Sequence, residues 1–296
     1  MKINRCRSFL FTVIFLVCLV APQAGRAAEK HFLWRATSST STVYLLGSVH
    51  FMKKDAYPLA KVIEEAFDRC ETLAVEADIN NVGPGTFQML RQAGFYEPKD
   101  SIADHVSRQT YAYVTEEAAR LGLPAIVFNR QKPWFLGITM SSLEMMRSGY
   151  DPNYGIDKYF LTRASGQKKI VELESIEYQI SLLADLPDGE QESFLLYTVK
   201  DLRSMVEQVD ALMAAWGTGD SDRMASILTR SIENDASLKK VYKKIMTDRN
   251  RNMAKKISTY LRSGGRVFVV VGAGHMVGDE GIIELLKKEG YRVDQL

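Results

Sequence analysis

Two of the four histidines in this 296-residue chain stand in the same local setting, almost at opposite ends of the sequence. His50 closes a Gly-x-x-His motif at residues 47–50, and His275 closes a second one at residues 272–275. Each motif follows an apolar, β-branched run that is typical of a buried strand, and a glycine after a strand permits a sharp turn. Open α/β sheets bind ligands beyond the carboxyl ends of their strands. The two histidines are therefore the best candidates for one shared site.

Acidic residues stand at the ends of two further expected strands. Glu76 and Asp78 share one face of the strand expected over residues 71–78, and Glu174 ends the strand expected over residues 168–174. A carboxylate in an apolar strand is costly unless it is paired or bound to a cation. Taken singly, each of these acids or histidines is more often structural, but together they indicate a shared site. A set of imidazoles and carboxylates suits Mn, Co, Zn or Fe better than Ca or Mg.

Arg249 lies on the apolar stripe of a helix expected over residues 237–261, with Asn250 beside it. A guanidinium that faces a core needs an anion. That anion is either a substrate oxygen or a buried carboxylate such as Glu76, which would lock the helix to the sheet. Asp157, in contrast, stands at the start of an expected helix and is interpreted as a charge that stabilises the helix N-terminus.

The elements that must position these residues alternate between strand and helix at both ends of the chain. Strands are expected at 32–36, 42–46, 71–78, 168–174, 266–271 and 291–293, and helices at 59–70, 86–93, 108–121, 133–147, 156–164 and 280–289. Residues 175–262 show only helical periods. This pattern predicts a single α/β (α+β) domain over residues 28–296, with a central mixed β-sheet flanked by helices and an all-helical insertion at about 175–262.

Residues 1–27 have the features of a signal peptide. A basic start precedes an apolar run over residues 9–20, and small residues at Gly25 and Ala27 predict cleavage after Ala27. The protein is therefore expected in the periplasm or outside the cell, with no stable membrane span after cleavage. An uncleaved segment would act instead as an N-terminal membrane anchor. Cleavage would leave Cys70 as the one cysteine, which excludes an internal disulfide.

The charge pattern bears on the partners. Cleavage would remove four basic residues and no acid, which changes the formal net charge from +2 to −2. The chain has no basic block with interleaved aromatic residues, so nucleic acid is not expected as a partner. The sequence sets no oligomeric state.

These motifs together resemble those of the TraB/GumN family, which includes exported bacterial proteins and is related to the Tiki proteases. The resemblance spans nearly all of the chain after the signal peptide and is carried by residues 32–34, 43–50, 75–78, 132–134, 154–157, 173–174, 249–254 and 271–275. It implies an α/β core similar to those of the erythromycin esterases and the ChaN-like proteins. It also implies metal-dependent hydrolysis of an amide or peptide bond, as in the Tiki branch.

Four residues would then carry the metal chemistry. His50 and His275 would hold a divalent transition metal (Mn, Co, Zn or Fe) together with Glu76 or Glu174, and Glu76 is the first choice. A metal lowers the pKa of a bound water molecule, and the remaining carboxylate would accept the proton of that water.

The remaining candidates would act on the substrate. Arg249 and Asn250 are catalytic candidates, because a guanidinium could hold a developing oxyanion or a substrate carboxylate. Arg249 and Asp78 would contact a peptide or small-molecule substrate. The alternative function is a non-catalytic binding protein for haem, iron or another small ligand, which would use the same two histidines.

Overall fold

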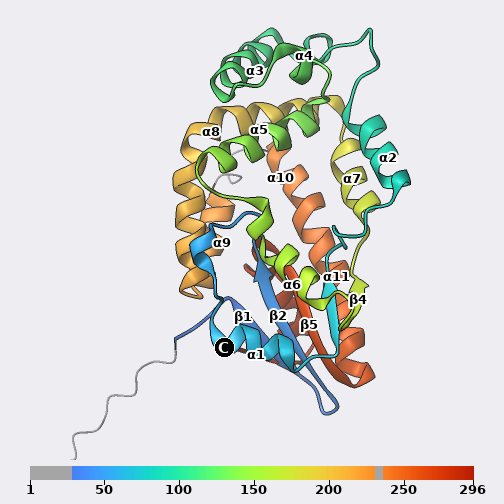
Figure 1. The fold of residues 1–296 in the computed structure, drawn as a ribbon, viewed down its shortest axis with the longest axis vertical. Helices are drawn as coiled ribbons and strands as arrows, with labels where there is room; N and C mark the ends of the chain where they lie inside the picture. Colours follow the sequence, from blue (N-terminus) through green and yellow to red (C-terminus); the bar gives the residue numbers. More distant parts are fainter. Residues whose placement is uncertain (1–28, 231–235) are drawn as a thin grey trace, which may run out of the picture.

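A computed structural model describes residues 29–230 and 236–296 of the chain. The expected signal peptide over residues 1–27, with its cleavage site at Ala27, lies outside the described residues. The described residues form a mixed six-stranded sheet in the order β4-β3-β5-β2-β1-β6, with helices packed on both of its faces (Figure 1). The α/β class and the central mixed sheet are therefore confirmed. Within these residues no helix has the length and apolar character needed to cross a membrane.

The two central strands, residues 41–48 and 265–272, are apolar and rich in β-branched residues, which suits strands that helices bury on both faces. The first two strands form an antiparallel hairpin, and the last strand pairs antiparallel with the first. The other pairs are parallel, so the carboxyl ends of β2, β3, β4 and β5 lie at one edge of the sheet. The strands are β1 (Leu33–Thr37), β2 (Ser41–Ser48), β3 (Thr72–Val75), β4 (Lys169–Glu172), β5 (Gly265–Gly272) and β6 (Arg292–Gln295).

Two helices cover each face of the sheet. On one face, Phe268 of β5 packs against Phe67 and Phe160, with ring centroids 5.5 and 5.0 Å apart. On the other face, Ile257 belongs to the core beneath the sheet. Cys70 is buried in the core, and its thiol is free. The first face carries α1 (Lys61–Asp68) and α6 (Ile156–Ala164), and the second carries α11 (Asp248–Ser263) and α13 (Ile282–Lys288).

Further helices form a layer beyond the carboxyl edge of the strands, which we call the helical cap (Figure 1). Apart from the connecting turns, the described residues between 175 and 262 are helical, as expected. Helices from residues 84–147, however, pack on α7 and α8 and belong to the same cap, which the sequence analysis did not anticipate. The cap comprises α2 (Pro84–Gly94), α3 (Arg108–Leu121), α4 (Ala125–Phe128), α5 (Pro133–Arg147), α7 (Ile176–Ala184), α8 (Asp188–Gly217), α9 (Ser221–Arg230) and α10 (Ala236–Tyr242).

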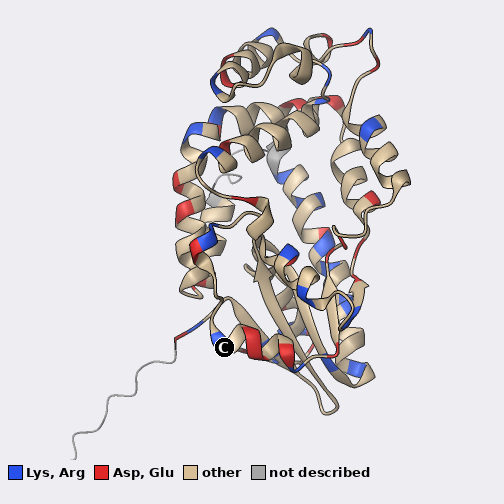
Figure 2. Ribbon diagram, in the orientation of Figure 1, with Lys and Arg blue, Asp and Glu red and all other residues tan. Residues whose placement is uncertain are grey.

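Charged residues of both signs are interspersed along these helices (Figure 2). Four of them join three helices of the cap. Arg120 of α3 donates to Glu117 on its own helix and to Glu144 of α5, each over 2.6 Å, and Arg203 of α8 donates to Glu117 over 2.8 Å. Glu117 is buried, so its two arginine partners are needed to hold its charge there.

The helix expected over residues 237–261 is interrupted. A π-helical segment, η4 (Lys243–Thr247), lies between α10 and α11 and ends immediately before α11 begins. A π-turn adds a residue to the helical repeat and so changes the direction in which later side chains point. A pattern with a period of 3.6 residues does not reveal it. The shorter 3₁₀ segments are η1 (Lys54–Ala56), η2 (Ile102–Asp104) and η3 (Pro152–Tyr154).

Candidate functional site

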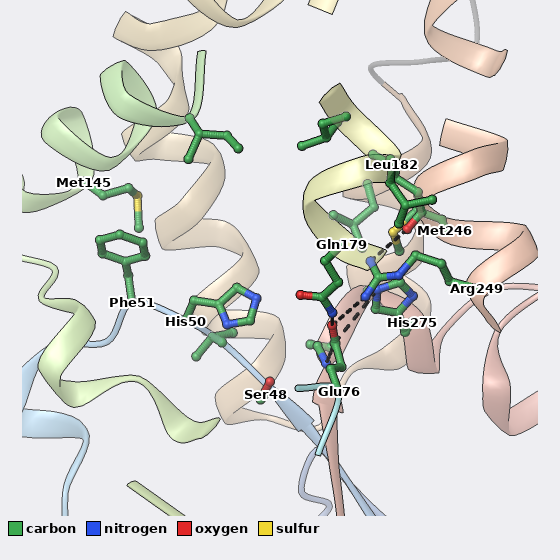
Figure 3. A pocket seen from close by; sticks show the side chains of 18 of the residues that line it. Ser48, His50, Phe51, Glu76, Met145, Gln179, Leu182, Met246, Arg249 and His275 are labelled. Atoms are coloured by element: carbon green, nitrogen blue, oxygen red, sulfur yellow. Dashed lines mark hydrogen bonds and ion pairs between the residues drawn. The ribbon is translucent and has the colours of Figure 1, made fainter. Parts of the chain in front are cut away.

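A cavity of about 770 Å³ lies between the cap and the carboxyl edge of the parallel strands. Its floor holds His50, Glu76, Arg249 and His275, which come from four separate segments of the chain (Figure 3). Glu174 is buried behind this floor, with 4% of its side chain exposed, and does not line the cavity. The structure therefore brings together the histidines and carboxylates that follow the strands, with Glu174 set back from the rest.

Glu76 is held by donors on three sides. Its Oε1 accepts from the Gly272 amide over 2.6 Å, and its Oε2 accepts from Arg249 Nη2 over 2.6 Å and from Gln179 Nε2 over 3.0 Å. A β-carbon at Gly272 would lie 3.1 Å from Oε1, so glycine leaves room for this contact. Burial raises the pKa of Glu76, but the charges of His275 and Arg249 outweigh it and lower the pKa to about 2. Glu76 is a carboxylate at neutral pH.

Arg249 joins the two carboxylates. Its Nε donates to Glu174 over 2.9 Å, and its Nη2 donates to Glu174 over 2.7 Å and to Glu76 over 2.6 Å. Its Nη1 donates to the carbonyl of Ile245 in the π segment over 3.1 Å. Burial lowers the pKa of Arg249, but the hydrogen bond to Glu174 and the charges of both glutamates outweigh it and raise the pKa. All three guanidinium nitrogens therefore have protein partners, two of them in the buried carboxylates, and Arg249 also lines the cavity.

His275 lies in α12 (Ala273–Met276) and is oriented by Asn250 of α11. Asn250 Nδ2 donates to the carbonyl of Glu280 over 2.8 Å, so its Oδ1 faces His275 Nδ1 over 2.6 Å and accepts its proton. Burial lowers the pKa of His275 to about 4, although the charge of Glu76 opposes the shift. The imidazole is therefore neutral at pH 7, with a lone pair on Nε2. This nitrogen lies 3.9 Å from Glu76 Oε1.

His50 is paired with Asp157 in the first turn of α6. Nδ1 of His50 lies 3.2 Å from Asp157 Oδ1, and this hydrogen bond raises the pKa of His50 to about 9. The contact depends on close approach of the two segments. Ile156 N donates to the carbonyl of Val49 over 3.0 Å, and a β-carbon at Gly155 would lie only 2.5 Å from the His50 carbonyl oxygen. His50 itself exposes 66% of its side chain and lines the cavity.

The positions or contacts of three residues differ from what the sequence analysis predicted. Asp78 does not line the cavity: β3 ends at Val75, and the Asp78 carboxylate accepts from the Asn80 amide over 3.1 Å in the following turn. Asp157 was interpreted as a helix charge only, yet it holds His50. Gln179 was not singled out, although it donates to both glutamates of the floor. Asp157 stands in the segment 154–157 that carried the family resemblance, whereas Gln179 has no comparable signal.

The two histidines share one arrangement. In each, Nδ1 contacts a side-chain oxygen that a helix supplies. Such outer contacts orient metal-ligating histidines and histidines that transfer protons. Nε2 of neutral His275 carries no proton, whereas the raised pKa of His50 keeps a proton on its Nε2 at pH 7, which a metal would have to displace. Within residues 29–230 and 236–296, no group of three or more His, Cys, Asp or Glu side chains is already arranged to hold a metal ion.

Comparison with known proteins supports the resemblance. A model of the TraB/PrgY/gumN family matches residues 32–295. The chain is 23% identical to the uncharacterized protein YbaP of Escherichia coli (strain K12), over 87% of this chain and 94% of that relative. It is 28% identical to a metalloprotease TIKI homolog of Amphimedon queenslandica, over 98% of this chain and 68% of that relative. No solved structure matches. The chain therefore belongs to the TraB/PrgY/gumN family.

Proposed function

We propose that this protein is an exported metal-dependent hydrolase that cleaves an amide or peptide bond. The similarity to a protein named as a metalloprotease supports this proposal. The observation that carries it is that His50 and His275 both line the cavity beside Glu76, each with its Nδ1 held by a side-chain oxygen. We also propose that the α/β core of this protein is of the same kind as in the erythromycin esterases and the ChaN-like proteins.

The donor chemistry at the floor fits a cation. The lone pair of His275 Nε2 and the negative charge of Glu76 face each other over 3.9 Å, and neutral His275 has no proton on that nitrogen. Two such acceptors in a buried place attract a positive ion. We therefore propose His275, Glu76 and His50 as the residues that hold Mn, Co, Zn or Fe. When bound, such a metal supplies a water molecule of lowered pKa and polarises a carbonyl group.

We assign the remaining roles to side chains of the protein itself. Glu76 lines the cavity and Glu174 does not, so we assign Glu76 the contact with metal or water. Glu174 acts as a positioning residue, because it holds Arg249, which in turn holds Glu76. Asp157 and Asn250 fix the orientation of the two imidazoles.

Metal analysis beside amide hydrolysis tests this function. We expect the purified wild-type protein to contain about one transition metal per chain and to cleave at least one member of a panel of quenched-fluorescent peptides and N-acyl amino acids. His50→Ala and His275→Ala should each lose most of the metal and the activity, and the double variant should lose little more, because residues that share one function are not additive.

His105→Ala is the matched control. His105 does not line the cavity: it stacks on Tyr96 with ring centroids 4.3 Å apart and pairs with Asp100 over 2.9 Å, so its change should leave metal and activity intact. A wild type that neither binds nor needs Mn²⁺, Co²⁺, Zn²⁺ or Fe²⁺ would refute the metal site. A Soret band in the absorbance spectrum, with no hydrolysis, would favour the haem-binding alternative.

Export has its own test. N-terminal sequencing of protein recovered from the envelope or the medium should begin near Ala28. A soluble cytoplasmic protein with an intact Met1 would exclude export and leave the hydrolase proposal standing.

A further inference from the structure

The cavity is sharply divided between a polar floor and apolar walls. Among the described residues that line it, the polar and charged side chains are Ser48, His50, Glu76, Gln179, Arg249 and His275. Apart from the backbone at residues 272–274, the rest of the lining is aliphatic, aromatic or methionine side chains, which Figure 3 shows for Phe51, Met145, Leu182 and Met246 above the floor. A ligand that fills the cavity must therefore be polar at one end and apolar along the rest.

The walls offer little to a peptide backbone. They come mainly from α5, α7, α8 and α9, and the backbone groups inside an α-helix are already paired with each other. Peptides that bind in extended form take their main-chain hydrogen bonds from an exposed strand edge, whereas β2 and β5 each pair on both sides. A peptide in the upper cavity would bury unsatisfied N–H and C=O groups, and each would weaken binding by roughly five- to a hundredfold.

The lining also suits a flexible, unbranched ligand. Four methionines line the cavity: Met145, Met213, Met224 and Met246. Methionine side chains are flexible and polarisable, so they adapt to ligands without a fixed shape. The volume of about 770 Å³ lies within the range of roughly 300–1,000 Å³ that is usual for small-molecule sites.

From these features we infer that the substrate is an amphiphile with one long, unbranched hydrocarbon chain, joined through an amide to a polar group. This inference rests on the proposed hydrolase function and names its substrate class. The hydrocarbon chain lies along the apolar walls, and the amide lies at the floor beside Glu76, His50 and His275. Hydrolysis breaks the bond between the acyl carbon and nitrogen. The oxygen of water joins the acyl carbon, and a proton of that water goes to the amine that leaves.

Binding and turnover of a homologous series test the inference separately. The full-length protein is titrated by calorimetry with N-acylglycines from acetyl through butanoyl, octanoyl and dodecanoyl to hexadecanoyl, and hydrolysis of the same compounds is followed by release of glycine. We expect affinity to rise about fourfold per methylene until the chain fills the cavity, since each buried methylene contributes that much. A leucine peptide blocked at both ends, with as many carbon atoms as the dodecanoyl compound, should bind more weakly.

A matched pair of variants tests where the hydrocarbon chain of the ligand lies. Ile138 of α5 lines the cavity, whereas Ile126 of α4 is 83% exposed and does not. Ile138→Trp fills part of the cavity and should shorten the chain length at which affinity stops rising. Ile126→Trp should leave the series unchanged, and melting curves confirm that both variants fold. The wild-type series is informative even if Ile138→Trp does not fold.

The outcomes separate this inference from the proposed function. Binding that rises with chain length but brings no release of glycine supports the hydrocarbon site and counts against hydrolysis. Hydrolysis of peptides or short amides without any dependence on chain length keeps the hydrolase and overturns the hydrocarbon site. Tighter binding of the blocked leucine peptide than of the dodecanoyl compound overturns it as well.

Discussion

Asn250 accepts the Nδ1 proton of His275 over 2.6 Å, and this single contact sets which nitrogen of the buried histidine faces the carboxylate of Glu76. Asn250 could not turn its amide the other way without losing its own hydrogen bond to the Glu280 carbonyl. The orientation of the His275 imidazole thus depends on Asn250, which does not itself line the cavity. Asn250 is therefore a positioning residue, and its removal should affect function more than folding.

We therefore expect Asn250→Ala to lose metal affinity and hydrolysis by about 10- to 100-fold, the usual effect of removing the group that orients a ligand. Metal content and activity are measured together with the melting temperature. Asn252→Ala, at an exposed position on the same helix, is the control and should match the wild type. Equal metal affinity in Asn250→Ala and the wild type would show that His275 needs no such support.

Arg249 should behave as a structural residue. Arg249→Lys keeps the charge but cannot reproduce the planar fork that reaches both glutamates. Leaving a buried carboxylate without its partner costs about 3–5 kcal/mol, so we expect a clear drop in the free energy of unfolding, measured in urea. Arg251→Lys, half-exposed and paired with Glu280 over 3.0 Å, should change it by less than about 1 kcal/mol. Unchanged stability in Arg249→Lys, with turnover lost, would favour the substrate-binding role instead.

The strand ends were the part of the site that sequence could predict. His50, Glu76 and His275 each follow an apolar run that ends close to them, and parallel pairing brings such ends to one edge. The continuous apolar, β-branched runs identify the strands, and the Gly-x-x-His motifs identify the loops that follow two of them. Because these signals are local, they can be recognised without knowing the rest of the fold.

The partners of those residues could not be predicted in the same way. Asp157 and Gln179 reach the floor only because α6 and α7 pack against it, and packing between distant segments leaves no local pattern. The contribution of residues 84–147 to the cap was missed for the same reason. The π segment before Arg249 was missed because a period of 3.6 residues does not reveal it. Asp78 was assigned to the site because β3 was expected to continue beyond Val75.

The stability of the cap should depend on pH through Glu117. Burial raises the pKa of Glu117, but hydrogen bonds from Arg120 and Arg203 outweigh it and lower the pKa below its ordinary value of 4.5. A carboxyl whose pKa is lower in the folded state stabilises the fold above its unfolded pKa and loses that effect as the pH falls through its folded pKa. We therefore expect Glu117→Gln to be less stable than the wild type at pH 7, with the difference shrinking below about pH 4.5.

Urea unfolding of both proteins across this pH range measures the effect. Glu116→Gln is the control, because Glu116 also pairs with Arg203 but is 63% exposed and should contribute little at any pH. A difference between Glu117→Gln and the wild type that stays constant with pH would mean that the charge of Glu117 is not what stabilises the cap.

Gly155 offers a test of the contact between His50 and Asp157 that changes neither residue. A β-carbon at Gly155 would lie 2.5 Å from the His50 carbonyl oxygen, so Gly155→Ala must push the start of α6 away from the loop after β2. We expect a loss of about 1–3 kcal/mol in the free energy of unfolding, which is typical of overpacking, and a fall in hydrolysis per folded molecule. Gly189→Ala is the control, since a β-carbon there would meet nothing within 4 Å. If Gly155→Ala loses stability but keeps full activity, the precise placement of Asp157 beside His50 does not matter for catalysis.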